Sequence, residues 1–293
     1  MNSRQRAEFI FERLARRIPA PSLRELLEAS LGLKVSRLQV SRRGLNDLDY
    51  ISRHTGLGAC LAEYKVLTEV NSGRGSLWND RVVEHVGLDE PHGDYLVYIA
   101  EDQNTAERAR VLDAHGDDDQ LGELLAVPGC CRAFYSCSIR DHILEDPLWI
   151  VAEQCQTPWD IPQGANVCAQ YFERGFLSHF PCDLGCPQSR LEAKRRFTEI
   201  GQLCEQFAEW LAEGCKWSYL ILRQGIAAMM AQPARCGSYR VTKFIGTRGA
   251  VPSWILQREF LSIRNGHLER PSALQGEARM VDEAIMIIAS EEW

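Results

Sequence analysis

The sequence predicts an α+β protein with a mixed sheet and a helical, cysteine-rich central region. Two patterns support this: helical spacing of apolar residues near the N-terminus and over 188–213, and a continuous β-favouring run over 95–100. The 293 residues, 45% of them apolar, can build a large core, and this composition excludes disordered and collagen-like classes. We expect an N-terminal α+β lobe over residues 1–115 and a cysteine-bearing main region over 116–293, joined as one continuous globular unit.

The elements of the N-terminal lobe follow from apolar spacing and from turn residues. A helix over 4–18 stops before Pro19, and Ser22 with Glu25 forms a capping box for the next helix. The run over 95–100 is bounded by polar residues and predicts a buried strand. The remaining expectations are a helix over 22–30, strands over 33–40 and 60–70, a polar loop over 44–58 and a helix over 105–114.

The main region is expected to be mostly helical before it ends in strands and one helix. Asp119 is placed to cap a short helix, and Pro128 is placed to open another. The longest helical pattern covers 188–213. The full set of expectations is helices over 119–125, 128–138, 165–176, 188–213 and 278–289, with strands over 217–222 and 239–245.

Charge is unevenly distributed along the chain. Residues 1–43 hold nine arginines and Lys34 against four glutamates, a balance of +6, whereas the whole chain carries −7. A basic layer on an acidic body favours an anionic partner, such as nucleic acid, an acidic protein or second subunit, or an anionic substrate. The alternative without a binding function is that these arginines lie on the solvated faces of two helices. The pI of about 5.6 and the lack of an aromatic-interleaved basic run argue against nucleic acid.

The cysteine count is the unusual part of the composition. No apolar run reaches the length of a membrane-spanning helix, and the N-terminus forms a charged amphipathic stretch, which predicts a cytoplasmic protein without a membrane partner. In that compartment the 11 cysteines should be reduced, which favours metal binding or thiol chemistry over disulfides.

The first motif is Pro128-Gly129-Cys130-Cys131-Arg132. If Pro128 opens a helix, both cysteines lie in its first turn, where the positive end of the helix favours thiolates. Arg132 adds positive charge and is a candidate substrate-binding residue. Adjacent side chains on a helix diverge, which predicts different roles for the two cysteines. The alternative is inert packing behind the preceding helix.

The second motif is His179-Phe180-Pro181-Cys182-Asp183-Leu184-Gly185-Cys186. A turn with this spacing can bring His179, Cys182 and Cys186 to one metal ion, zinc or iron, with Cys130 or Cys131 as a fourth ligand. A metal-free site is the second interpretation, in which His179 acts as the base for a cysteine nucleophile. Packing without chemistry is the third.

Two further groups are candidates for weaker reasons. Asp47, Asp49 and His54 fall in the expected polar loop, where an aspartate could act as a general base beside the histidine; turn chemistry is the alternative. Arg74 lies in a Gly-Arg-Gly-Ser turn whose backbone could approach a phosphate or sulfate, although the strand and helix of a P-loop are missing.

The two cysteine motifs resemble the family known as domain of unknown function 483, over roughly residues 118–215. The chain departs from that pattern at Ala126-Val127-Pro128, where the family has Gly-Tyr-Pro, and at Asp183, where it has Ser. The resemblance implies one site containing Cys130, Cys131, His179, Cys182, Cys186 and Ser189, with Ser189 binding substrate. It also implies a link to natural-product pathways, among them azinomycin-type aziridine formation. In such a pathway the basic N-terminal layer would suit an acidic carrier protein that holds the substrate.

These observations lead to one main functional expectation and two alternatives. The main one is a lyase- or cyclase-type biosynthetic enzyme that moves a proton on a small amino-acid-type substrate, with elimination or ring closure. It would need no cofactor or a zinc or iron ion. The alternatives are a structural or interaction protein that binds zinc or iron, and an RNA-binding protein.

Overall fold

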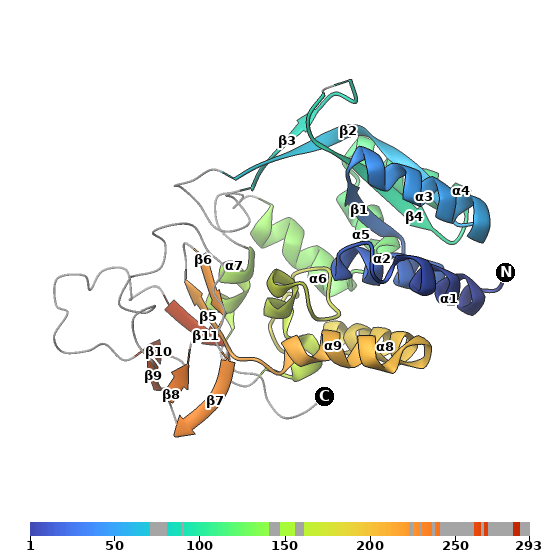
Figure 1. The fold of residues 1–293 in the computed structure, drawn as a ribbon. Helices are drawn as coiled ribbons and strands as arrows, with labels where there is room; N and C mark the ends of the chain where they lie inside the picture. The colour runs from blue at the N-terminus through green and yellow to red at the C-terminus, as the bar shows by residue number, and fades with distance from the viewer. Residues whose placement is uncertain are drawn as a thin grey trace. The chain divides into compact units, whose positions relative to one another are not determined.

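The chain folds into two compact units (Figure 1). Unit 1 comprises Met1–Glu69, Val82–Ala133 and Arg195–Glu209, and unit 2 comprises Val70–Arg81, Phe134–Lys194 and Trp210–Trp293. The computed structural model describes residues 1–70, 81–89, 91–140, 147–155, 161–222, 225–228, 230–235, 238–240, 261–264, 267–268 and 284–287. The predicted α+β class is confirmed.

A four-stranded sheet forms the centre of unit 1, with the strand order β1-β4-β2-β3. The strands are β1 (Ser36–Val40), β2 (Gly58–Val70), β3 (Arg81–Val86) and β4 (Asp94–Ala100). The predicted strands over 33–40, 60–70 and 95–100 are therefore confirmed, with shifted ends. β4 pairs antiparallel with both β1 and β2. The pairings with a defined register among the described strands are all antiparallel, although a mixed sheet was expected.

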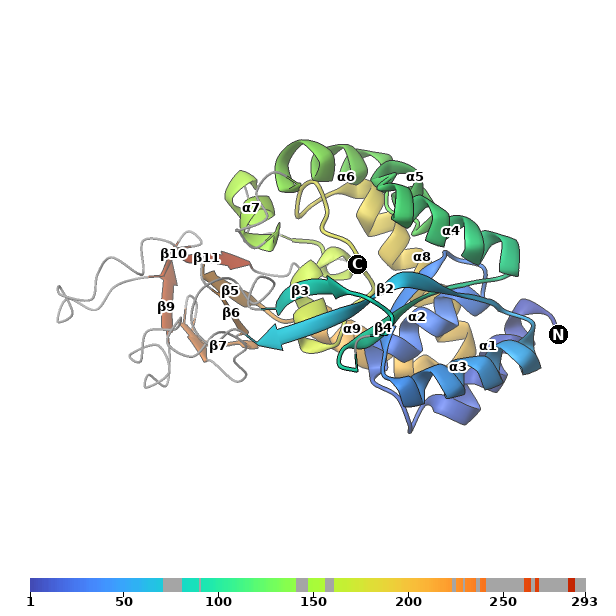
Figure 2. The same cartoon turned by 90° about the horizontal axis from the view of Figure 1, so that it is seen from above.

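Helices cover both faces of this sheet, as Figure 2 shows. One face packs against α1 (Ser3–Leu14), α2 (Ala20–Ser30) and α3 (Arg42–Thr55), and the other against α4 (Gln103–His115) and α5 (Asp118–Leu124). β4 explains why both faces are apolar. Val97 and Ile99 point to the first core and Leu96 and Tyr98 to the second, because successive strand side chains alternate between faces.

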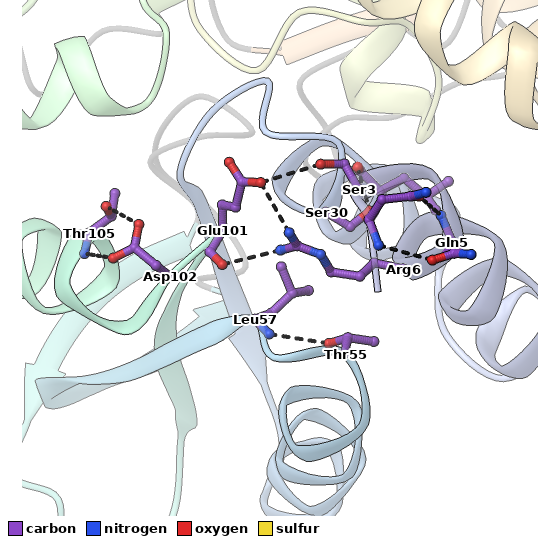
Figure 3. Close-up of polar contacts among 11 residues, drawn as sticks. Ser3, Gln5, Arg6, Ser30, Thr55, Leu57, Glu101, Asp102 and Thr105 are labelled. Atoms are coloured by element: carbon purple, nitrogen blue, oxygen red, sulfur yellow. Dashed lines mark hydrogen bonds and ion pairs between the residues drawn. The ribbon is translucent and has the colours of Figure 1, made fainter.

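Polar contacts fix the start of α1 against the end of β4 (Figure 3). Asn2 and Gln5 form a reciprocal capping box at the N-terminus of α1. Arg6 donates to the Glu101 backbone carbonyl at 3.2 Å and to the Glu101 carboxylate at 3.1 Å. Asp102 next to it caps α4 by accepting from Thr105 N at 2.9 Å. One short segment after β4 therefore anchors two helices.

The sequence prediction was wrong for residues 44–58, which form helix α3 and the start of β2 and not a polar loop. Ser41 caps the helix by accepting from Gly44 N, and Gly56, at φ 74°, ends it in the left-handed conformation that glycine adopts easily. Leu48 and Ile51 are buried, so the apolar stripe is narrow. Polar residues cover the wide solvent face, and this hid the helical pattern.

The predicted caps of two other helices were also wrong. α2 begins after Pro19, so Ser22 lies inside the helix and makes no cap. Asp117, and not Asp119, caps α5 by accepting from Gln120 N. Proline in the first turn and several aspartates in a row leave the exact first residue open in the sequence.

A buried group of five charged side chains lies in unit 1. Glu28 is fully buried, and Lys34 Nζ lies 3.0 Å, Arg24 Nε 3.7 Å and Arg196 Nη1 3.9 Å from its carboxylate. Glu25 lies 2.5 Å from Lys34 Nζ and 3.1 Å from Arg24 Nη2. Burial alone would raise the pKa of Glu25, but the charges of Lys34 and Arg24 outweigh burial and lower this pKa to about 2.

Unit 2 contains helices, short 3-10 turns and small sheets. Its described helical elements include a π-helical turn over Tyr135–Ile139, α7 (Pro147–Gln154) and 3-10 turns over Gln163–Ala165 and Val167–Phe172. The last of these replaces the helix predicted over 165–176.

Two side chains of unit 2 contact residues on or just after α9 (Glu205–Cys215). Asn166 donates to the carbonyls of Cys215 at 3.1 Å and Trp217 at 3.0 Å. The Arg174 guanidinium lies 4.0 Å from the ring centroid of Trp210.

Two helices occupy the segment in which one long helix over 188–213 was predicted. They are α8 (Pro187–Leu203) and α9 (Glu205–Cys215), separated at Cys204. The apolar spacing continues across the break, so the pattern alone did not reveal it.

The strands after α9 form two small sheets. One has the order β11-β5-β6, with β5 (Tyr219–Leu222), β6 (Gly225–Ala228) and β11 (Ala284–Ile287). The other contains β7 (Met230–Arg235), β8 (Ser238–Arg240), β9 (Leu261–Arg264) and β10 (His267–Leu268). The helix predicted over 278–289 was wrong where it can be compared, because 284–287 pair with β5. An apolar run of that length fits either state. Residues 241–245 of a predicted strand lie outside the described residues.

Replacing Glu28 with Gln should lower the free energy of unfolding by about 3–5 kcal/mol, because buried cations lose their compensating charge. Glu8→Gln is the matched control, since Glu8 also pairs with an arginine four residues away but on the surface. Its cost should stay below about 1 kcal/mol. Urea unfolding followed by circular dichroism measures both, and equal losses in the two variants would contradict this expectation.

Acid should remove the contribution of Glu25 to stability. Its folded-state pKa of about 2 lies below the ordinary value of 4.5, so the ionised form stabilises the fold above pH 4.5. That contribution should be lost as the pH falls from 4.5 toward 2. Unfolding free energies measured across this range should fall less steeply for Glu25→Gln than for the wild type. Identical slopes for the two proteins would show that Glu25 does not titrate in this way.

Candidate metal centre

Cys130 and Cys131 lie at the start of α6 (Gly129–Phe134), as the proline-initiated pattern predicted. The Cys131 and Arg132 amides both donate to the Pro128 carbonyl at 2.9 Å, which forms the first turn. The two Sγ atoms are 3.8 Å apart. The expectation that these side chains diverge is therefore wrong, because rotation about χ1 lets neighbouring side chains converge. The expectation of different roles for the two cysteines stays a prediction.

Helix α5 and the loop after it position this turn through Arg132. Its guanidinium donates to Asp119 at 2.8 Å and to the Val127 carbonyl at 3.0 Å. A Cβ on Gly122 would lie 2.7 Å from the Arg132 side chain, so glycine allows this close approach. Ala126 adopts φ 54°, a left-handed conformation that costs free energy for a residue with a Cβ. These contacts show that Arg132 stabilises the local structure. The substrate-binding role expected for Arg132 stays a prediction.

Cys182 and Cys186 lie in a tight turn that leads into α8. The Gly185 amide donates to the Asp183 carboxylate at 2.7 Å, and the Cys186 amide donates to the Asp183 carbonyl at 2.9 Å. This is an Asx-type turn, in which a short polar side chain closes the backbone. Cys186 directly precedes Pro187, the first residue of the 17-residue α8. The positive end of that helix favours an anionic thiolate at this position.

The four cysteines of the two motifs lie together. The Sγ atoms of Cys130, Cys131, Cys182 and Cys186 are all within 4.8 Å of one another. Cys131 and Cys186 are buried, Cys182 is half-buried and Cys130 is exposed. Sulfur atoms at these distances could hold one metal ion, because thiolates are the soft ligands that zinc and iron prefer.

His179 is not part of that group of ligand atoms. Its Nε2 lies 2.9 Å from Ser189 Oγ, and both side chains are buried. Ser189 is in the first turn of α8, three residues after Cys186. The structure thus pairs the predicted imidazole with the predicted serine, and the metal group consists of sulfur alone.

The candidates from the expected loop lie on α3. Asp49 forms an ion pair with Arg53, and His54 Nδ1 lies 2.7 Å from the Tyr50 carbonyl. Asp47 is half-buried, whereas Asp49 and His54 are exposed. These contacts are local to one helix and join neither aspartate to His54, so they give no support to the expected pairing of a general base with this histidine. Arg74 lies outside the described residues.

The remaining described cysteines have ordinary surroundings. Ten cysteines are described, and none of these ten forms a disulfide. Burial and a hydrogen bond to Glu107 at 2.6 Å raise the pKa of Cys60 to about 11, which makes its thiol unreactive. Cys168 and Cys215 are fully buried, as expected for packing residues.

Comparison with known proteins identifies no relative of this chain. No family model, no curated protein and no solved structure matches the chain. The resemblance to domain of unknown function 483 therefore depends on the two motifs alone and stays a prediction. Among the described helices, none combines the length and the apolar character needed to cross a membrane.

Proposed function

We propose that the protein binds one zinc ion through the thiolates of Cys130, Cys131, Cys182 and Cys186. The observation that supports this most directly is the separation of the four Sγ atoms, all within 4.8 Å. Zinc–sulfur bonds of about 2.3 Å in a tetrahedron place neighbouring sulfurs about 3.8 Å apart. The Cys130–Cys131 separation of 3.8 Å equals that edge.

Zinc suits this sulfur group better than an iron–sulfur cluster. In a four-iron cluster each cysteine binds a different iron atom, so the thiolates stand farther apart than around a single ion. A single iron ion would fit the same tetrahedron, and the metal content of the purified protein distinguishes it from zinc.

A four-thiolate zinc ion has a structural role. Sites with four protein ligands leave no position for water or substrate, whereas catalytic zinc sites keep one position open. The two pairs of cysteines come from segments about 50 residues apart in the sequence, which one ion would join. Binding of the ion would therefore contribute folding free energy directly.

The biosynthetic reaction expected from the sequence stays a prediction beside this proposal. In that interpretation Cys130 or Cys131 acts as a reactive thiol with His179 nearby. In the zinc proposal the same thiolates are metal ligands and do not take part in proton transfer. The two interpretations therefore differ in the reactivity of Cys130.

Purified protein should contain about one zinc ion per chain, because all four ligands are supplied by the protein. Cys182→Ser and Cys186→Ser should each lower zinc affinity by at least about tenfold and lower the melting temperature, since a hydroxyl is a poor zinc ligand. Cys137→Ser is the matched control, because Cys137 is an exposed cysteine outside the group. Elemental analysis and a competition assay with a chromogenic chelator measure both quantities. Metal-free protein with unchanged stability in all three variants would overturn the proposal.

Alkylation near neutral pH should separate the metal site from a reactive thiol. Cys130 is exposed, yet coordination should protect it from iodoacetamide until a chelator removes the ion. Cys137, also exposed, should react at the same rate with and without chelator. Mass spectrometry of tryptic peptides gives both rates. Rapid labelling of Cys130 in untreated protein would instead favour thiol chemistry.

A further inference from the structure

The basic excess of the first 43 residues lies on the surface of unit 1. Arg24 and Lys34 are buried together with two glutamates, so these four charges cancel. The positive balance of the segment therefore stays with its other residues. Arg4 and Arg6 form ion pairs with glutamates. Of the six arginines left, Arg37 is on β1, and five are exposed on or beside α1 and α3: Arg13, Arg16, Arg17, Arg42 and Arg43. Within the described residues, none of these five has an ion pair with an acid.

Aromatic side chains from α1 and α3 form a stack that the Arg13 guanidinium contacts. The Phe9 ring lies 6.4 Å from the Tyr50 ring and 6.0 Å from the His54 ring, at interplanar angles of 23° and 12°. The ring centroids of Tyr50 and His54 are 4.0 Å apart. The Arg13 guanidinium lies 5.7 Å from the Phe9 centroid. Tyr50 is 42% exposed, so this stack presents ring surface to solvent.

Helical spacing places Arg13 and Arg43 on the helix faces that carry the stack. Arg13 follows Phe9 by four residues on α1, and Arg16 and Arg17 lie in the turn after that helix. On α3, Arg43, Tyr50 and His54 are separated by seven and four residues and share one face. The acids on these segments are Glu8 and Asp49, which are paired with arginines, and Glu12 and Asp47. The five arginines outnumber the last two.

We propose that this surface, the α1/α3 arginine–aromatic surface, binds single-stranded nucleic acid. Bases would stack on the exposed rings of Tyr50 and His54, which the Phe9 ring supports, and the arginines would contact the phosphates. The guanidinium fork matches phosphate oxygens and also stacks on bases. An acidic protein would satisfy the charges but would give the exposed ring stack no comparable partner. Every face of a base offers a stacking surface, so sequence preference is expected to be weak.

This surface and the cysteine group share no residue. Loss of zinc binding and loss of nucleic-acid binding are separate measurements, so either proposal can fail without the other.

The test is fluorescence anisotropy with the full chain and labelled oligouridylate and oligothymidylate of about 12 nucleotides, a length within usual binding sites. A polyglutamate peptide of equal charge serves as the acidic-protein probe. Both oligonucleotides should bind, and affinity should fall steeply with salt. Tyr50→Ala should weaken binding at least about fivefold because base stacking is removed. The double variant Arg16→Ala/Arg17→Ala should weaken binding and reduce the salt slope by about 0.7 for each phosphate that is no longer neutralised.

Two variants control for removal of any exposed tyrosine or arginine. Tyr135 is 43% exposed, nearly the same as Tyr50, and Arg108 is an exposed arginine on α4. Tyr135→Ala and Arg108→Ala should bind like the wild type, with circular dichroism confirming the fold of every variant. Absence of binding at low salt overturns the proposal. Polyglutamate that binds as tightly as the oligonucleotides, with Tyr50→Ala unchanged, also overturns it and identifies the surface as a contact for acidic protein.

Discussion

The buried charges around Glu28 constrain the arrangement of unit 1 more than any other interaction. Arg24 and Glu28 come from α2, Lys34 from the segment before β1 and Arg196 from the middle of α8. A buried carboxylate is tolerated only when its cations are in place, because an unpaired charge in the core costs several kcal/mol. Helix α8, distant in sequence from α2, is therefore required for this core. The Arg195 guanidinium adds a hydrogen bond to the Leu33 carbonyl at 2.8 Å.

The same cluster explains why the N-terminal charge excess is available at the surface. Its residues from the first 43 positions are two cations and two carboxylates, so the +6 balance stays with exposed residues. Pairing with Glu8 and Glu101 occupies Arg4 and Arg6. What remains is concentrated on α1 and α3, two helices that pack on one face of the sheet through Ile10, Leu48 and Ile51. Core packing thus determines which charges can meet a partner.

The cysteine group depends on local structure, because each of two short turns positions a pair of thiols. Pro128 starts one turn, and the Asp183 side chain closes the other. Each turn is determined by neighbouring residues, so the turn could be predicted from the sequence. Which residues share a ligand group could not be predicted: His179 is nearer to Cys182 and Cys186 in sequence than Cys130 is, yet it pairs with Ser189. Short sequence distance does not decide side-chain direction when the backbone turns sharply.

The sequence by itself determined the α+β class, the buried strand β4, the helical start at Pro128 and the two cysteine motifs. These features depend on short-range signals: alternation, turn residues and spacing. Only the tertiary structure decided that residues 42–55 form a helix, that 284–287 pair as a strand with β5, and that both Cys130 and Cys131 join the same group. It also brought Phe9 to Tyr50 and His54, so that an aromatic and basic surface forms without an aromatic and basic run in the sequence. The physical reason is that contacts between distant residues arise from burial of shared apolar faces, which the local pattern does not specify.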